Sequence, residues 1–318
     1  MGVWTGKQLG FTGYGHYLPG APVPIDRLPV AREREISPAA LDRLGIRTLH
    51  LSPPQESAVD LAVLAGGRAL ADAGVAPAEL ELVVVSNSTE RYLVPELGPR
   101  ITAGLGANSA LGFDVCGGCA GFAHGVQTAA ALMQVHGWNT ALVIAAEQFS
   151  HLTRGSADSL VAGDASGAVV LRRGVPEGSG LIDSVFHSDG AEADVFVVDP
   201  AGGPSVSYRR DRLFDLAVDT QVKAAEELLG RNGLGLADVD LFIPHPGAHR
   251  VITDLTLRLG IAPDKVASTF ADTGNTVSAM IPTALSIRRA AGLLAPGSLV
   301  LATTAGAGWF GGGLLFVI

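Results

Sequence analysis

Several kinds of residue are scarce in this chain, and each scarcity excludes a class of protein. With only two cysteines in 318 residues, the chain has no disulfide framework. Charged residues are also scarce, at 17% of the chain. Even so, no apolar run reaches the roughly 18 residues that a membrane span needs. The formal net charge of -9 argues against general nucleic-acid binding. Residues 1–7 lack a signal-peptide pattern, so the cytoplasm is the expected location.

The sequence around the two cysteines predicts a nucleophile. A short apolar run, 113–115, ends in small residues that include Cys116 and Cys119, and an alanine-rich stretch predicted as a helix follows over 120–135. A cysteine at such a strand-to-helix turn lies near the free amides of the first helical turn. Their partial positive charge favours the thiolate over the thiol. Cys119 is therefore the candidate nucleophile.

The same residues allow other interpretations. A free cysteine is commonly a small buried hydrophobic residue. Cys116 and Cys119 also form a C-x-x-C pair, which occurs in redox sites and as half of a zinc site. His245 and His249 could nominally complete such a site, but the two pairs lie much further apart than zinc-finger ligands do. The nucleophile hypothesis requires no metal and no organic redox cofactor.

The two halves of the chain repeat the same pattern. Each contains a helix, a glycine turn and a buried strand, followed by a second apolar strand and a buried helix. The matching positions are Asn87 with His245 at an offset of 158, Phe113 with Phe270 at 157, residues 141–146 with 298–303 at 157, and, more loosely, residues 167–171 with 313–317. A register kept over four segments indicates a tandem duplication. We expect two domains, residues 1–172 and 173–318.

The repeat predicts an α/β fold and a central site. Alternating strands and helices indicate mixed sheets covered by helices. The helices that follow Cys119 and Asn275 are nearly uncharged, so we expect both to be buried between two sheets, which gives five layers. Cys119 and Asn275 occupy equivalent turns, and His245 follows a buried strand. Ligands of α/β sheets bind at the carboxyl ends of strands. Pseudo-symmetry should therefore bring the three side chains to one pocket.

Five segments carry a resemblance to a known family. They are Cys119–Phe122, Ile243–His245, Gly274–Thr276 together with Ser278, Gly163–Ala168, and Gly306–Gly308. Together, in their order along the chain, they resemble the β-ketoacyl-acyl carrier protein synthase III family of the thiolase superfamily, and the resemblance covers essentially the whole chain. It implies the five-layered αβαβα thiolase fold built from two duplicated halves.

The resemblance also implies an activity and its residues. It suggests that Cys119 carries an acyl group taken from coenzyme A or an acyl carrier protein. His245 and Asn275 would then assist the decarboxylation of a malonyl thioester, whose carbanion extends the acyl chain by two carbons. The backbone amides of Cys119 and Gly308 are the implied oxyanion hole. No metal takes part in this chemistry.

Two departures from the family pattern bear on function. Pro246-Gly247-Ala248 stands where the family usually has Gln-Ala-Asn, which changes the surroundings of His245. Residues 38–47 lack the tryptophan that stacks on the adenine of coenzyme A in the family. Arg250 is kept, and in the family it meets the acidic carrier protein. The alternative for Arg250 is a helix salt bridge with Asp254.

The resemblance further implies a homodimer. Tyr92, Leu93 and Val94 fall in a segment that reaches the substrate pocket of the partner subunit in the family. Some specialised-metabolism relatives do not elongate chains but transfer an acyl group from a carrier protein or coenzyme A to another carrier, an alcohol or an amine. The sequence thus leaves three hypotheses: a condensing enzyme, an acyl shuttle and a non-catalytic binding protein. The retention of both His245 and Asn275 favours condensation.

Overall fold

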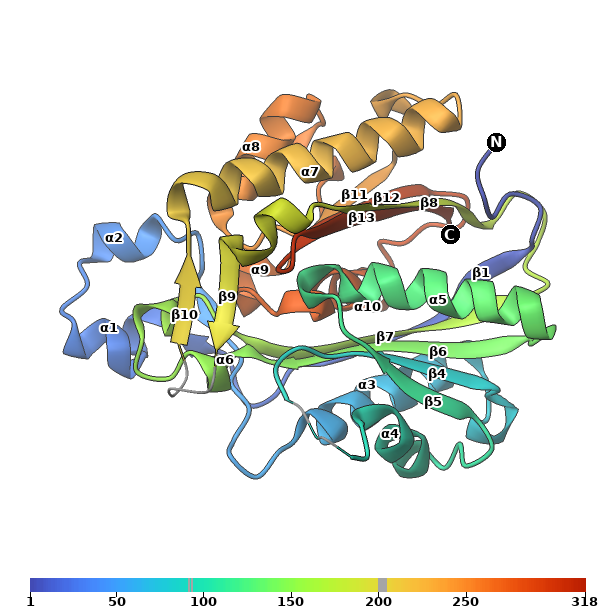
Figure 1. Ribbon diagram of the computed structural model, residues 1–318, viewed down its shortest axis with the longest axis horizontal. Coiled ribbons are helices and arrows are strands. Elements are labelled where there is room, and N and C mark those ends of the chain that lie inside the picture. Colours follow the sequence, from blue (N-terminus) through green and yellow to red (C-terminus); the bar gives the residue numbers. More distant parts are fainter. Residues whose placement is uncertain (91, 93, 200–204) are drawn as a thin grey trace.

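Helices and sheets alternate in five layers in this protein, as a computed structural model of residues 1–90, 92, 94–199 and 205–318 shows (Figure 1). Helices α3 (Ala58–Ala73) and α4 (Leu97–Leu105) form one outer layer, and α7 (Arg210–Arg231) and α8 (His249–Leu259) form the other. Two sheets lie inside these layers, and α5 and α10 lie between the sheets. The predicted five-layered arrangement is confirmed.

The first sheet has five strands in the order β1-β7-β6-β4-β5. The strands are β1 (Leu9–Tyr17), β7 (Asp164–Arg173), β6 (Thr140–Gln148), β4 (Leu82–Ser86) and β5 (Leu111–Val115). β4 runs parallel to both β5 and β6, whereas β7 is antiparallel to β6 and β1. Every residue of β4 and β6 is buried, because helices cover both faces of the sheet.

The second sheet repeats the first. Its four strands are β11 (Leu241–Pro244), β12 (Leu299–Gly306), β13 (Phe310–Val317) and β8 (Gly180–Ser188), in the order β11-β12-β13-β8. The pairings β11–β12, β12–β13 and β13–β8 have the same directions as β4–β6, β6–β7 and β7–β1. A single parallel bridge, Phe242 to Val266, stands in the place of the β4–β5 pairing. The topology thus agrees with the duplication. The division into domains at 172/173 stays a prediction, and it falls at the last residue of β7.

Helices α5 (Gly121–His136) and α10 (Met280–Ala290) form the central layer. α5 packs on β4, β6 and β13, and α10 packs on β1, β7 and β11, so each helix touches both sheets. Their side chains share one core with the inner faces of the strands, including Phe122 and Met133 from α5 and Leu285 from α10. Alanine and glycine dominate α5 because a helix between two sheets has little room for long side chains. The expected burial of both helices is confirmed.

Short elements complete the chain at the end where the site lies. They are α1 (Pro29–Glu33), α2 (Pro38–Asp42), α6 (Phe149–Leu152), α9 (Phe270–Thr273), the pair β2 (Val23–Pro24) and β3 (Thr48–Leu49), and the antiparallel pair β9 (Phe196–Asp199) and β10 (Ser205–Tyr208). β9 and β10 stand at the end of the layers opposite the two chain termini (Figure 1). Within the described residues, no helix combines the length and apolar character needed to traverse a bilayer.

Candidate active site

Cys119 lies in a one-turn 3-10 helix, Gly118–Ala120, that connects β5 to α5. Strand β12 of the second half packs directly against this turn. A Cβ atom on Gly306 would lie 2.8 Å from the backbone nitrogen of Cys119 and 3.0 Å from that of Ala120, so only glycine fits there. The Thr304 hydroxyl also donates a hydrogen bond of 3.0 Å to the Cys119 carbonyl. The second half of the chain therefore fixes the position of the first half's cysteine.

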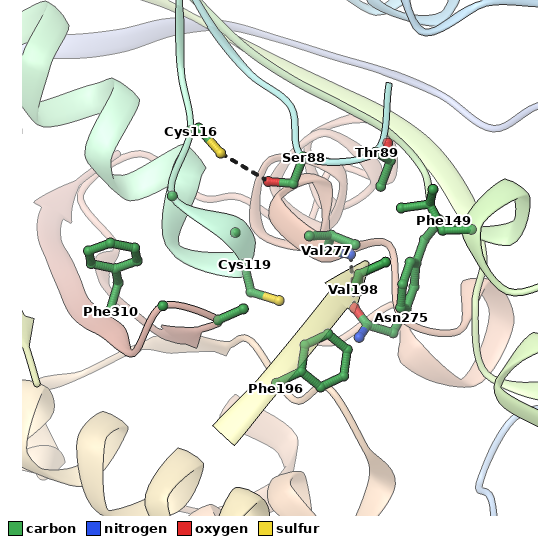
Figure 2. A pocket seen from close by; sticks show the side chains of 15 residues that line it. Ser88, Thr89, Cys116, Cys119, Phe149, Phe196, Val198, Asn275, Val277 and Phe310 are labelled. Carbon is green, nitrogen blue, oxygen red and sulfur yellow. Dashed lines mark hydrogen bonds between the residues drawn. The ribbon is translucent and has the colours of Figure 1, made fainter. Parts of the chain in front are cut away.

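Cys119, His245 and Asn275 line one cavity of about 90 Å³, together with Gly306 and Ala307. Cys119 comes from the turn before α5, His245 from the position just after β11, and Asn275 from the loop before α10. A neighbouring cavity of about 250 Å³ shares Cys119 and Asn275 with the first (Figure 2). The structure thus brings Cys119, His245 and Asn275 to one cavity, as the sequence predicted. The catalytic roles of the three residues stay predictions.

His245 is the first residue beyond β11, and only 4% of it is exposed. Burial lowers the pKa of its imidazole to about 4, because a low-dielectric site disfavours the charged ring. His245 is therefore neutral at neutral pH, with one ring nitrogen protonated and the other carrying a lone pair. Its Nδ1 is buried and has no hydrogen-bond partner among the described residues.

Asn275 is held by its backbone and by one side of its amide. Its backbone nitrogen donates to the Val161 carbonyl at 2.7 Å, and its carbonyl accepts from Gly163 at 3.1 Å. The side-chain Oδ1 accepts from the backbone nitrogen of Val277 at 2.8 Å (Figure 2). Since the oxygen is used in this turn, the Nδ2 amide is the group left to serve the cavity. Asn275 and His245 thus bring neutral hydrogen-bond donors beside Cys119.

The expected stabilisation of the Cys119 thiolate is wrong for the resting protein. Burial, followed by repulsion from the Glu147 carboxylate, raises the pKa of the Cys119 thiol to about 12. A backbone hydrogen bond lowers the pKa but does not outweigh these two effects. Cys119 itself lies in the 3-10 turn directly before α5, whose first residue is Gly121. The thiol keeps its proton until a substrate or base changes its surroundings.

Sequence reasoning missed Glu147, which is fully buried on β6 behind the site. Its carboxylate accepts hydrogen bonds from the Ser278 hydroxyl at 2.5 Å, the Ser88 backbone nitrogen at 3.0 Å and the Thr89 hydroxyl at 2.9 Å. Burial outweighs these bonds and raises the pKa of Glu147 to about 7. A lone acidic residue that directly follows the apolar run 141–146 was the available signal.

The larger cavity is mostly apolar. Its lining includes Phe149, Phe196, Val198, Val277 and Phe310, and β9 carries Phe196 and Val198 across it near Asn275 (Figure 2). Such a surface suits a hydrocarbon chain attached to Cys119.

The remaining substrate-site candidates lie at or beyond the cavity edges. Gly308, at a φ of 83°, lines only the larger cavity, whereas its neighbour Ala307 lines both. Tyr92 and Val94 line neither, and Val94 is 89% exposed. Leu93 lies outside the described residues.

Arg250 lies in the first turn of α8 and is paired with acidic residues. Its guanidinium contacts Asp254 at 3.0 Å and Asp215 at 3.1 Å, so the helix salt bridge named as an alternative does form. The Arg250 side chain is 61% exposed, and such pairs contribute about 1 kcal/mol at most. Its charge also lies 6.0 Å from the ring centre of Phe214, a residue of the smaller cavity. Arg250 is therefore near the cavity rim.

The zinc and redox alternatives gain no support from the geometry. Among the described residues neither cysteine forms a disulfide, and Cys116 is exposed, with its sulfur 3.9 Å from the Ser88 hydroxyl (Figure 2). Across the described ranges there is no cluster of three or more His, Cys, Asp or Glu residues suited to a metal ion.

The substitution Glu147→Gln should lower the pKa of Cys119. It keeps the shape of the side chain but removes the charge that opposes the thiolate above pH 7. Alkylation of Cys119 by iodoacetamide, followed by mass spectrometry across pH, should show its midpoint moving to lower pH. Glu96→Gln, a change at an exposed glutamate, is the control and should not move the midpoint. An unchanged or higher midpoint in Glu147→Gln would contradict this account of the thiol.

Comparison with known proteins identifies the family. A family model described as 3-oxoacyl-[acyl-carrier-protein (ACP)] synthase III matches residues 113–190, and the model of its C-terminal part matches residues 229–318. A β-ketoacyl-[acyl-carrier-protein] synthase III of Rhodospirillum rubrum is 36% identical, over an alignment that covers 95% of this chain and 97% of the relative. The enzyme of the same name from Ruegeria pomeroyi is 34% identical, with 93% and 94% covered.

Solved structures agree with the sequence comparison. A 3-oxoacyl-[acyl-carrier-protein] synthase III of Aquifex aeolicus superposes with a TM-score of 0.91 at 27% identity, covering 98% of this chain and all of that one. The priming β-ketosynthase of the R1128 polyketide pathway gives a TM-score of 0.90 at 32% identity, covering 100% and 98%. These matches confirm the predicted family and fold. The chain belongs to the 3-oxoacyl-[acyl-carrier-protein] synthase III family and is an acyltransferase with the thiolase fold.

Proposed function

We propose that this protein condenses an acyl thioester with a malonyl thioester through an acyl-Cys119 intermediate and releases a β-ketoacyl thioester two carbons longer. The observation that carries the proposal is the single cavity lined by Cys119, His245 and Asn275 in a chain of this family. The test is to incubate the purified protein with acyl-coenzyme A and malonyl-carrier protein and to follow protein mass and product. A protein that never acquires an acyl group, or forms no malonyl-dependent product, contradicts it.

In the first half-reaction, the Cys119 sulfur attacks the acyl carbonyl and expels the donor thiol. Because burial keeps the proton on sulfur at neutral pH, that proton must leave as the bond forms. The departing thiolate can accept this proton, so that the donor leaves as a neutral thiol. The carbonyl oxygen would receive hydrogen bonds from the backbone amides of Cys119 and Gly308; Ala307, which lines both cavities, offers a third amide.

In the second half-reaction, the malonyl thioester loses CO2 and leaves an enolate. The ring N–H of His245 and the Nδ2 amide of Asn275 would stabilise the enolate oxygen, which neutral donors can do without surrendering a proton. The low pKa of His245 supports this role because it keeps the ring neutral. The enolate carbon then attacks the acyl-Cys119 carbonyl, the new C–C bond forms, and Cys119 leaves as thiolate and regains a proton.

One observation favours a second function, acyl transfer without elongation. Pro246-Gly247-Ala248 follows His245 in place of the amide-bearing residues of the family pattern, so the surroundings of the histidine differ. Transfer to an alcohol, an amine or another carrier would use acyl-Cys119 but consume no malonyl group. Product formation that does not depend on malonyl-carrier protein would select this function instead.

We also propose a homodimer with β5 at its interface. β5 is the edge strand of the first sheet, and Leu111 at its start is 50% exposed. Tyr92 and Val94 are exposed too, as residues that reach a partner would be in an isolated subunit. An apolar sheet edge of this kind tends to pair with another chain.

We likewise propose that an acyl carrier protein is a partner of this protein and that the protein is located in the cytoplasm.

The substitution Cys119→Ala should abolish covalent acylation and leave the fold intact, because alanine fits the same small site. Intact-mass measurement after incubation with an acyl thioester, together with thermal melting, checks both parts. Cys116→Ala is the matched control and should acylate almost as the unmodified protein does. Acyl transfer that survives Cys119→Ala but is lost in Cys116→Ala would reverse the assignment.

The substitutions His245→Ala and Asn275→Ala should each slow condensation about a hundredfold or more, as loss of one donor to a developing oxyanion typically does. Acylation of Cys119 should fall less, because these donors act mainly when the enolate forms. The acylation rate, by quenched-flow mass spectrometry, and the product rate are measured separately. Equal losses in both steps would assign the two residues to support of the nucleophile or the fold.

The substitution Arg250→Ala should raise the KM for carrier-bound substrate, and salt should diminish the difference because it screens exposed charges. Carrier carboxylates would have to replace Asp215 and Asp254 as partners of the guanidinium, which such weak exposed pairs allow. A short pantetheine thioester without phosphate or carrier should show little change. Identical losses for both substrates would leave Arg250 with the helix salt bridge alone.

A further inference from the structure

Gln221 is a fully buried polar residue on α7, in a part of the helix that otherwise packs with aliphatic side chains. Its neighbours on this face include Val218, Val222 and Leu228, which pack against the second sheet. A buried amide costs free energy unless its hydrogen bonds are satisfied, so a leucine would be the simpler residue here. The contacts of the Gln221 amide indicate what it does.

The Gln221 amide grips the main chain of His245 on both sides. Its Oε1 accepts from the His245 backbone nitrogen at 3.2 Å, and its Nε2 donates to the His245 carbonyl at 2.9 Å. The remaining two bonds join Oε1 to the Thr303 hydroxyl at 3.1 Å and Nε2 to the Ala217 carbonyl at 3.2 Å. Both N–H groups and both lone pairs of the amide are therefore used. The two carbonyls also fix which way the amide points.

The main chain of His245 depends on these hydrogen bonds because the regular pairing of the sheet ends there. β11 ends at Pro244, and although the His245 nitrogen still donates to the Thr303 carbonyl at 2.8 Å, its own carbonyl is met by Gln221. Pro246 has no N–H with which to continue the ladder, and Gly247 turns the chain away at a φ of 60°.

The imidazole itself has no anchor at Nδ1, which has no hydrogen-bond partner in the described part of the chain. The place of the ring in the cavity is then set by the backbone that carries it and by packing. The family pattern would put side-chain amides just after the histidine, and this chain has Pro246-Gly247-Ala248 there. Gln221 brings a side-chain amide to the same histidine from α7.

From these contacts we infer that Gln221 is a positioning residue for His245: its amide fixes the His245 main chain and so holds the imidazole beside Cys119 and Asn275. Its kinetic consequence rests on the proposed function, because it falls on whichever step His245 serves. The neighbouring Thr304 bonds the Cys119 carbonyl, so adjacent residues of β12 help to hold the histidine and the cysteine. Small displacements of a catalytic group are enough to slow a reaction strongly.

The test uses Gln221→Leu, which keeps a side chain of similar size but removes the amide and its hydrogen bonds to His245. In the full-length protein, condensation should slow about tenfold to a hundredfold with little change in the KM for malonyl-carrier protein, and Cys119 acylation should change less. Thr303→Val is the matched control, because it removes one bond to Gln221 and leaves both bonds to His245; it should have a much smaller effect.

Two further measurements separate positioning from a general structural role. In a His245→Ala background, Gln221→Leu should cause no additional loss of condensation, because its effect passes through the imidazole. The NMR signal of the His245 ring, identified by its disappearance in His245→Ala, should shift in Gln221→Leu and stay in place in Thr303→Val. An additive loss, or an unmoved His245 signal, overturns the inference. The ring signal tests the positioning role of Gln221 even if the protein does not condense substrates. A protein that does not condense would refute the proposed function alone.

Discussion

The contact between Gly306 and the turn that carries Cys119 is the constraint on which the site depends. No side chain fits between this glycine and the backbone nitrogens of Cys119 and Ala120, so strand β12 and the start of α5 meet at backbone distance. This approach is possible because α5 packs between the two sheets and touches β13 as well as β4 and β6. The cavity exists where the two halves come together, and its shape follows from the packing of the central layer.

Burial from water sets the protonation states of the ionisable groups in this site. The same burial that assembles the cavity raises the pKa of Cys119 and Glu147 and lowers that of His245, so each group is driven toward its neutral form. A neutral histidine and a neutral asparagine are suited to an enolate, whereas a protonated thiol is a poor nucleophile. The first half-reaction must therefore begin from a protonated Cys119 thiol, which is less reactive than the thiolate that a helix terminus would favour. Binding of the thioester has to make loss of this proton easier.

Periodicity and repetition in the sequence were enough to predict the layers and the meeting of Cys119, His245 and Asn275, because strands and helices that repeat in register must pack in equivalent ways. The charge state of Cys119 could not be predicted in this way. It depends on Glu147, whose effect on the thiol arises only once the strand order places β6 behind the site. Gln221 escaped notice for a similar reason: one glutamine in a helix pattern gives no indication that it will face a strand end 24 residues later.

The order of these residues along the chain has a consequence for synthesis. Cys119 emerges from the ribosome early, whereas His245, Asn275 and Gly306 follow in the last quarter of the 318 residues. A nascent chain thus carries its thiol well before the wall that encloses it can form. Because strands of the second sheet complete the cavity, an unfinished chain has no means to hold or process an acyl thioester. Acyltransferase competence is therefore acquired only near the end of translation, when the C-terminal strands fold into place.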